Sequence, residues 1–235
     1  MNLILIETSA KACSVALSHD FDIVLRRECT EGPNHMSVLG VYVNEAMSEA
    51  RSRGYAIDAV AVSAGPGSYT GLRIGVSEAK GLAFGLGVPL IGVDTLKALC
   101  CHVMFSPALE NVLTQDVLLC PMVDARRMEV YAALYDWKLD TVRPASADVV
   151  DADYLHNTLE KKEVYFFGDG ADKLTNTITH PHAHFIPGVR VMATDMLALA
   201  TKACKEQKWD DTAYFVPFYL KDFVATKPKN MLENL

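Results

Sequence analysis

The stretch Gly65-Pro66-Gly67-Ser68-Tyr69-Thr70-Gly71-Leu72-Arg73 joins an apolar run, residues 57–64, to a helix-like run, residues 72–86. A strand that turns through glycines onto a helix N-terminus presents free backbone N–H groups to an anion. The simpler interpretation, which we favour for the motif alone, is a tight turn with Ser68 or Thr70 as the helix N-cap. The stretch lacks the Gly-Lys-[Ser/Thr] ending of a P-loop, so it does not indicate Walker-type nucleotide binding.

The composition is typical of a protein with a large buried core. The chain has 235 residues, 50% of them hydrophobic, and a formal net charge of −7. A chain with a net negative charge lacks the excess of basic residues that is typical of a protein that binds nucleic acid alone. The six cysteines form no CxxC pair, so we expect reduced thiols and a cytoplasmic protein. No apolar run reaches the ~18 residues of a membrane span, and residues 1–7 are typical of a first strand rather than a signal peptide.

The apolar runs form two series in the same order: strand, strand, strand, helix, strand, helix. In the first series we expect strands at 3–6, 13–17, 21–29, 57–63 and 89–93, and helices at 36–51, 72–86 and 95–105. After a linker, 106–115, we expect strands at 117–123, 128–135, 138–144 and 164–167, and helices at 152–161, from 171 and at 192–208. This repetition predicts an α/β fold with two similar halves, 1–105 and 106–235, each a mixed sheet with helices packed on it.

Two of the expected helices carry more apolar surface than one sheet can cover. On a helical wheel of 36–51, Val38 and Val41 fall outside the main apolar stripe. The helix 72–86 has a second apolar side with Ile74 and Phe84, and its internal glycines each cost about 1 kcal/mol relative to alanine. A helix with two apolar sides is buried on both. From the residues alone, other helices of this chain and a second chain are equally good candidates to cover that side.

Five sequence pieces occur in an order that resembles one family. They are Ile6-Glu7-Thr8-Ser9, residues 63–75 around the glycine stretch, Lys80-Gly81-Leu82-Ala83, Val123-Asp124-Ala125-Arg126-Arg127 and Gly168-Asp169-Gly170-Ala171. Together they resemble the TsaB (YeaZ) family, whose members are subunits of the bacterial machinery that makes threonylcarbamoyladenosine in tRNA. The resemblance implies the actin-like ATPase (ribonuclease H-like) fold, with duplicated βββαβα halves, and a heterodimer with the larger paralogue TsaD.

The resemblance also implies a role. It predicts a non-catalytic scaffold that supports threonylcarbamoyl transfer to the N6 of the tRNA adenosine beside the anticodon. The partners would be a TsaD-like paralogue and a TsaE-like ATPase, which would use the ATP and the metal, and tRNA would be reached only through the complex. The same surface could form a homodimer when the chain is alone. The implied partner-binding residues are Val38, Val41, Tyr42, Ile74, Ser77, Glu78, Gly81, Phe84 and Gly85. Residues 35–38 are more apolar than we expect of the family.

The metal motif that the resemblance implies for TsaD is missing here. TsaD-type proteins carry His-x-x-x-His on the helix after the short strand, and the matching positions hold Thr95 and Leu99. Residues four apart on a helix share a face, which lets two histidines bind one ion. A leucine has no metal-binding atom and threonine replaces imidazole poorly, so we expect no catalytic metal in this helix.

Two short polar segments are candidates for nucleotide binding. Glu7, Thr8 and Ser9 end the first strand, where actin-like enzymes bring a carboxylate and hydroxyls to phosphate and magnesium. Gly168, Asp169 and Gly170 follow a strong strand and could approach a phosphate. The alternatives are a polar strand end whose hydroxyls bond the next turn, and an ordinary Asp-Gly turn.

Several other polar residues admit two interpretations. Arg126 and Arg127, beside Asp124, could bind an anion or a partner, or stabilise a solvated turn. The alternating His180, His182 and His184 could converge on a metal, or form a solvated connection between a helix and a strand. His35, before the first helix, is expected to be a turn or cap-region residue.

Three rival functions remain open at this point. The first is an independent actin-like ATPase or phosphotransferase that uses Glu7, Thr8 and the turn at 168–170. The second is a metallopeptidase, suggested by an older glycoprotease label for the superfamily, against which the lost histidine pair argues. The third is a binding module for an acetyltransferase of a ribosomal protein.

Overall fold

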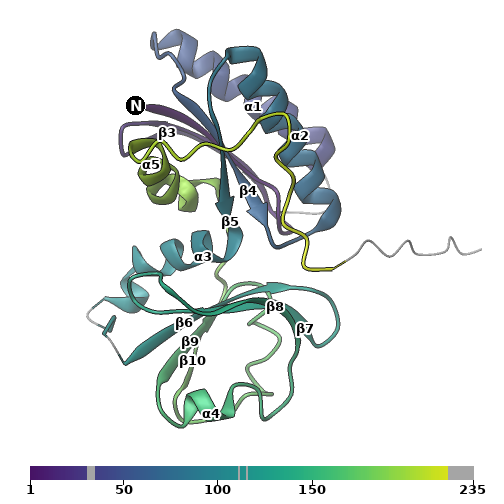
Figure 1. Cartoon of the computed structure of the whole chain (residues 1–235), viewed down its shortest axis with the longest axis vertical. Helices are drawn as coiled ribbons and strands as arrows, with labels where there is room; N and C mark the ends of the chain where they lie inside the picture. The colour runs from purple at the N-terminus through teal and green to yellow at the C-terminus, as the bar shows by residue number, and fades with distance from the viewer. Residues whose placement is uncertain (31–34, 111, 115, 222–235) are drawn as a thin grey trace, which may run out of the picture.

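Two five-stranded sheets organise the chain, and they are stacked end to end along its length (Figure 1). The structure is a computed structural model that describes residues 1–30, 35–110, 112–114 and 116–221. All strands of the first sheet precede residue 95, and all strands of the second follow residue 116. The side chain of His35 lies outside the described part, so its predicted role in a turn or cap stays a prediction.

The first sheet has the order β3-β2-β1-β4-β5. Its strands are β1 (Asn2–Glu7), β2 (Cys13–His19), β3 (Asp22–Cys29), β4 (Ala59–Gly65) and β5 (Leu90–Asp94). The central β1 pairs antiparallel with β2 and parallel with β4. Residues 3–6 of β1 are fully buried. Such a continuous apolar run is typical of a strand that is covered on both faces of its sheet.

Two long helices cover one face of this sheet, α1 (His35–Ser52) and α2 (Tyr69–Leu86) (Figure 1). Their inward residues match the stripes predicted from the wheel. The buried positions include Leu39, Val43, Ala46 and Ala50 of α1, and Leu72, Val76, Ala79 and Ala83 of α2. At the end of α2, Gly87 takes the left-handed conformation with φ 68° and its N–H bonds back to the last turn.

The second sheet repeats the connectivity of the first, with the order β10-β9-β6-β7-β8. Its strands are β6 (Val117–Asp124), β7 (Glu129–Tyr135), β8 (Thr141–Val149), β9 (Glu163–Phe167) and β10 (Ala183–Ile186). Here β6 is central, antiparallel to β7 and parallel to β9. The predicted fold class, two α/β halves with mixed sheets, is therefore confirmed.

The helices of the second half are shorter than the sequence predicts. The helix expected at 152–161 is reduced to α4 (His156–Leu159), because Asp151 accepts a hydrogen bond from the amide of Asp153 and Leu155 takes a positive φ. The helix expected from residue 171 is a series of turns. The strand expected at 138–144 begins at Thr141 instead, since the Asp136 carboxylate organises a turn by accepting two backbone N–H groups.

One of the three apolar clusters in the described part of the chain contains residues of both sheets. This cluster also contains residues of three helical elements, α3 (Thr95–Met104), η2 (Ala193–Met196) and α5 (Leu197–Lys205). The linker contains the short η1 (Pro107–Leu109). Leu3 of the first sheet and Leu119 of the second belong to this one cluster. The helix predicted at 192–208 is thus divided into η2 and α5.

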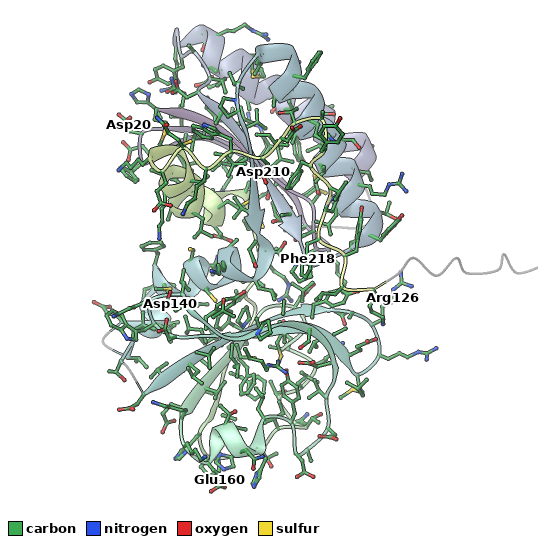
Figure 2. All side chains as sticks on the ribbon, viewed as in Figure 1. Asp20, Arg126, Asp140, Glu160, Asp210 and Phe218 are labelled. Atoms are coloured by element: carbon green, nitrogen blue, oxygen red, sulfur yellow. The ribbon has the colours of Figure 1, made fainter. Side chains whose placement is uncertain are left out.

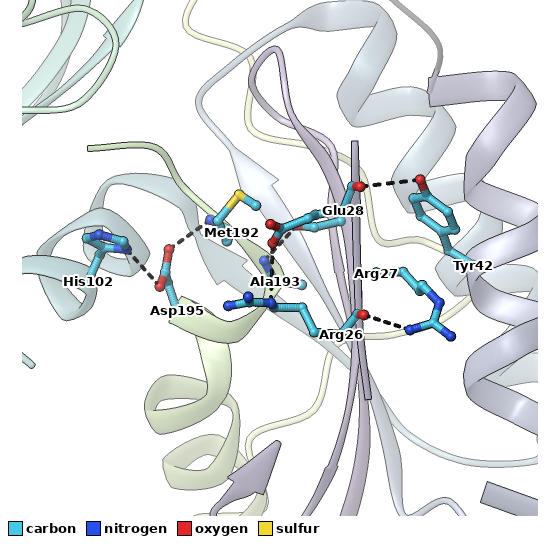
Figure 3. A network of polar contacts seen from close by, with 9 residues as sticks. Arg26, Arg27, Glu28, Tyr42, His102, Met192, Ala193 and Asp195 are labelled. Atoms are coloured by element: carbon cyan, nitrogen blue, oxygen red, sulfur yellow. Dashed lines mark hydrogen bonds and ion pairs between the residues drawn. The ribbon is translucent and has the colours of Figure 1, made fainter. Parts of the chain in front are cut away.

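Polar contacts hold η2 in place between the halves (Figure 3). Asp195 accepts a hydrogen bond from the amide of Met192 at 2.8 Å, and its other oxygen lies 3.1 Å from Nδ1 of His102 on α3. The amide of Ala193 donates to Oγ of Ser14 on β2 at 2.8 Å. These contacts tie a segment near the C-terminus to elements of the first half.

An extended segment at 209–221 returns to the first sheet and runs beside α2 (Figure 1). Asp210 accepts the amide of Gly92 at 2.6 Å, and Lys80 of α2 donates to the carbonyls of Ala213 and Phe215. We call residues 209–221 the C-terminal strap. The boundary at 105/106 separates the strands of the two sheets, whereas the strap and α5 pack on the first sheet.

Candidate partner-binding surface

The glycine stretch caps α2 and packs tightly against the end of β1. Ser68 is the N-cap, and its Oγ accepts the amide of Gly71 at 3.3 Å. A Cβ on Gly71 would lie 2.1 Å from the carbonyl oxygen of Thr8, and one on Gly67 would lie 2.3 Å from that of Ser9. Glycine is therefore required at these positions because the backbone that follows β1 approaches so closely.

The predicted phosphate-binding residues of β1 lie inside the protein. Glu7, Thr8 and Ser9 are fully buried. Oγ1 of Thr8 donates to the carbonyl of Gly71 at 2.8 Å, and the Glu7 carboxylate accepts the amide of Ser9. Burial raises the pKa of Glu7 to about 7, although the hydrogen bonds from Ser9 oppose this shift. These contacts give the three residues a structural role, and nucleotide binding by them stays a prediction.

The turn at 168–170 packs in a similar way against the end of β6. A Cβ on Gly168 would lie 2.2 Å from the carbonyl oxygen of Met122, and one on Gly170 would lie 2.9 Å from the backbone of Val123. The Asp169 carboxylate accepts the amide of Asp124 at 2.9 Å, and burial raises the pKa of Asp169. The structure therefore places both predicted nucleotide segments at strand ends, each against its own sheet.

The carboxylate and the two arginines of the β6–β7 turn behave as turn residues in this structure. Asp124 pairs with Lys173 and accepts the amide of Arg126 at 3.0 Å. Arg126 and Arg127 are exposed and have positive φ angles of 74° and 52°. Their side chains remain available to an anion or a partner, which stays a prediction.

The helix α3, on which the histidine pair was expected to be missing, is largely buried. Thr95 is fully buried at the start of α3, and Leu99 exposes 1% of its surface. The Asp94 carboxylate caps the helix by accepting the amides of Leu96 and Lys97 at 2.8 and 3.0 Å. Both positions of the missing histidine pair thus contribute to the core of the protein.

The outer face of α1 and α2 exposes large apolar side chains. Phe84 exposes 83% of its surface and Val41 exposes 54%. Between the helices lies an open groove of about 490 Å³, lined by Leu39, Gly40, Arg73, Ile74, Ser77 and Glu78. We call this groove, together with Val41, Gly81, Phe84 and Gly85, the α1–α2 face.

Most residues of the predicted partner-binding set reach this face. Val41, Ser77, Gly81, Phe84 and Gly85 are exposed, and Val38, Tyr42, Ile74 and Glu78 are half-buried. Tyr42 differs from the rest because its hydroxyl donates to the carbonyl of Glu28 on β3 at 3.4 Å (Figure 3). Sequence reasoning missed Gly40, whose signal was a glycine in the interior of an amphipathic helix.

The helical glycines divide into two kinds. A Cβ on Gly75 would lie 2.1 Å from Oγ1 of Thr8, so this glycine serves the interior. A Cβ on Gly40, Gly81 or Gly85 would meet no described atom within 4 Å. Nothing in the described part of this chain explains those three glycines, each of which costs about 1 kcal/mol relative to alanine.

The chain is similar to known proteins over most of its length. The TsaD family model, described as tRNA N6-adenosine threonylcarbamoyltransferase, matches residues 31–229. The chain is 32% identical to the tRNA threonylcarbamoyladenosine biosynthesis protein TsaB of Bacillus subtilis, over 72% of this chain and 71% of the relative. It is 28% identical to the protein of that name from Escherichia coli, over 97% of each chain.

A solved structure gives the same result for the fold. A Pseudomonas aeruginosa protein described as similar to peptidase YeaZ aligns with a TM-score of 0.72 and 26% identity, over 94% of this chain and 99% of that one. Across the described ranges, no helix carries an apolar stretch long enough to cross a lipid bilayer. The chain has the α/β actin-like fold and belongs to the TsaB (YeaZ) family of tRNA threonylcarbamoyladenosine biosynthesis proteins.

Proposed function

We propose that this chain is a non-catalytic subunit that pairs with a TsaD-like paralogue through the α1–α2 face. By this pairing it supports transfer of a threonylcarbamoyl group to the N6 of the tRNA adenosine beside the anticodon. The observation that carries the proposal is the exposure of Phe84, 83%, beside glycines with open space around them. Exposed apolar surface of this kind marks protein interaction sites, and glycines there let a partner helix approach closely.

The rest of the machinery would belong to other subunits. A TsaE-like ATPase and the TsaD-like paralogue would use the ATP and the metal, so the isolated chain should transfer no threonylcarbamoyl group. tRNA would be bound through the complex, which agrees with the net charge of −7 on this chain. When the paralogue is absent, the same face would mediate a homodimer, which analytical ultracentrifugation over a range of concentrations can detect.

The interface is tested by placing a charge in it. Phe84→Glu or Gly85→Glu would bury an uncompensated carboxylate on pairing and weaken the complex by several kcal/mol. A matched control is Phe105→Glu, because Phe105 exposes 78% of its surface at the end of α3, away from the α1–α2 face. We expect the control to co-elute with the TsaD-like chain in gel filtration, and the two interface variants to elute separately.

Two results would contradict this proposal. One is co-elution of the Phe84→Glu and Gly85→Glu variants with the paralogue, together with unchanged transfer activity of the reconstituted complex. The other is tight binding and hydrolysis of Mg-ATP by the isolated chain in a calorimetric titration, which would favour an independent actin-like ATPase.

A further inference from the structure

Three side chains converge at the far end of the second half, away from the α1–α2 face. His156 begins α4, Glu160 follows its last residue, and His180 lies before β10. One ligand atom from each of the three lies within 4.8 Å of the other two. Nε2 of His180 is 3.2 Å from Oε1 of Glu160, and Nε2 of His156 is 3.9 Å from the same oxygen. Figure 2 shows Glu160 at this end of the molecule.

The backbone around the three residues is fixed from both sides. The amide of Glu160 donates to the carbonyl of His156 at 2.9 Å, which sets their side chains on one side of the turn. Nδ1 of His182 lies 2.7 Å from the carbonyl oxygen of Leu159, and Leu159 itself exposes 1% of its surface. The histidine segment is therefore attached to the end of α4, and His180 exposes 19% of its side chain.

The donor set identifies the kind of ion that would fit. Two imidazole nitrogens and one carboxylate oxygen are typical ligands of Zn²⁺, whereas Ca²⁺ and Mg²⁺ prefer oxygen ligands alone. Ligands at the usual Zn²⁺ distances in a tetrahedron lie about 3.3 Å apart. The separations of 3.2 and 3.9 Å are close to this value, and the ligand atoms of the third pair, the two histidines, lie within 4.8 Å of each other. We propose that His156, Glu160 and His180 form a binding site for Zn²⁺, with water in the fourth position.

Binding of the ion would stabilise a weak part of the fold. α4 has four residues, a single turn that is not stable as an isolated helix. β10 is one of the two edge strands of the second sheet, and it begins three residues after His180. An ion held by His156, Glu160 and His180 would connect α4 directly to the segment that leads into this edge strand.

The hydrogen bonding of His180 provides a local signature of occupancy. In the described geometry its Nδ1 accepts the amide of His182 at 3.2 Å, so the ring proton is on Nε2 and faces Glu160. A Zn²⁺ ion on Nε2 moves the ring proton to Nδ1, and the amide of His182 loses its acceptor. The amide resonance of His182 should therefore shift on zinc addition at a pH above the ordinary histidine range.

The experiment uses the tag-free full chain after dialysis against a chelator. Zinc is added in competition with a chromophoric chelator, and we expect one Zn²⁺ per chain and a higher melting temperature. His180→Ala and the isosteric Glu160→Gln should each weaken zinc binding at least about tenfold, the loss that follows even removal of an outer partner of a metal ligand. The matched control is His184→Ala, because that ring stacks on Tyr165 and lies against Glu163, outside the cluster.

Two outcomes would overturn this proposal. The first is equal zinc affinity of the wild type and the Glu160→Gln and His180→Ala variants, which would place any bound ion elsewhere. The second is zinc binding by His184→Ala that is reduced as strongly as in His180→Ala, which would show general binding to the histidine-rich segment. Loss of zinc in both cluster variants, with the control and the folded NMR spectrum unchanged, would support the assigned ligands.

Discussion

A Cβ atom on Gly75 would lie 2.1 Å from Oγ1 of Thr8, and Thr8 is fully buried at the end of β1. This contact fixes the distance between α2 and the first sheet. Gly75→Ala should therefore force the helix or the strand to move, at a cost of about 1–3 kcal/mol that exceeds the gain in helix propensity. The melting temperature should fall by about 2–4 °C for each kcal/mol lost. A variant that melts at or above the wild-type temperature would contradict this prediction.

Gly81 provides the opposite case in the same helix. A Cβ there meets no described atom within 4 Å. Gly81→Ala should stabilise the isolated chain by up to about 1 kcal/mol, because alanine has the higher helix propensity. The same methyl group would crowd a partner helix, so we expect affinity for the TsaD-like chain to fall about tenfold or more. Thermal melting measures the first effect and a binding titration measures the second. Unchanged affinity would mean that no backbone approaches Gly81 closely.

The sequence predicts the helices and their buried faces well, but it predicts the roles of individual glycines poorly. The periodicity of α1 and α2 predicted their buried stripes, since each apolar position there faces the same sheet. Gly75 and Gly81 look alike in sequence, as two glycines in the interior of one helix, but a Cβ on Gly75 would meet Thr8 and a Cβ on Gly81 would meet no described atom within 4 Å. Only the position of β1 relative to α2 separates the two cases, and this position depends on the whole first sheet.

Residues without periodicity escaped prediction. The C-terminal strap has no helical or strand pattern, and its path depends on single contacts such as the one between Phe215 and Gly92, where a Cβ would lie 2.6 Å from the ring. β10, Ala183–Ile186, was not among the expected strands, and it overlaps the histidine-rich segment for which a solvated connection was one of the two interpretations. Both elements pair with partners distant in sequence, which local patterns do not contain.

Glu7 should make stability depend on pH near neutrality. Burial raises its pKa from 4.5 to about 7. The folded chain therefore holds a proton that the unfolded chain releases between these values, and the free energy of unfolding falls as pH rises through this window. The linked loss is on the order of 3 kcal/mol once the pH is above the folded pKa.

The isosteric Glu7→Gln variant removes this titration. We expect the variant to gain stability relative to the wild type as the pH is raised from 5 to 8, as measured by denaturant unfolding at each pH. Below the unfolded pKa both chains carry a neutral side chain, so their difference should not change there. A difference between wild type and variant that is constant over the whole range would contradict a buried, protonated Glu7.

The pair of His102 and Asp195 should make the stability of the fold depend on pH, and the cause is a hydrogen-bonded ion pair rather than burial. Its hydrogen bond to Asp195 raises the pKa of the imidazole above 6.5, and desolvation opposes this shift. The stabilising contribution is therefore fully present below pH 6.5 and is lost as pH rises through the folded pKa. An NMR titration should give a pKa above 6.5 for His102 in the wild type and a lower one in Asp195→Asn, which keeps an oxygen for the Met192 amide.

The same pair should show in the melting temperature, because Asp195 also holds η2 between the two sheets. His102→Ala should lower the melting temperature more at pH 5.5, where the imidazole is charged, than at pH 8.5. An equal loss at both pH values would refute the assignment.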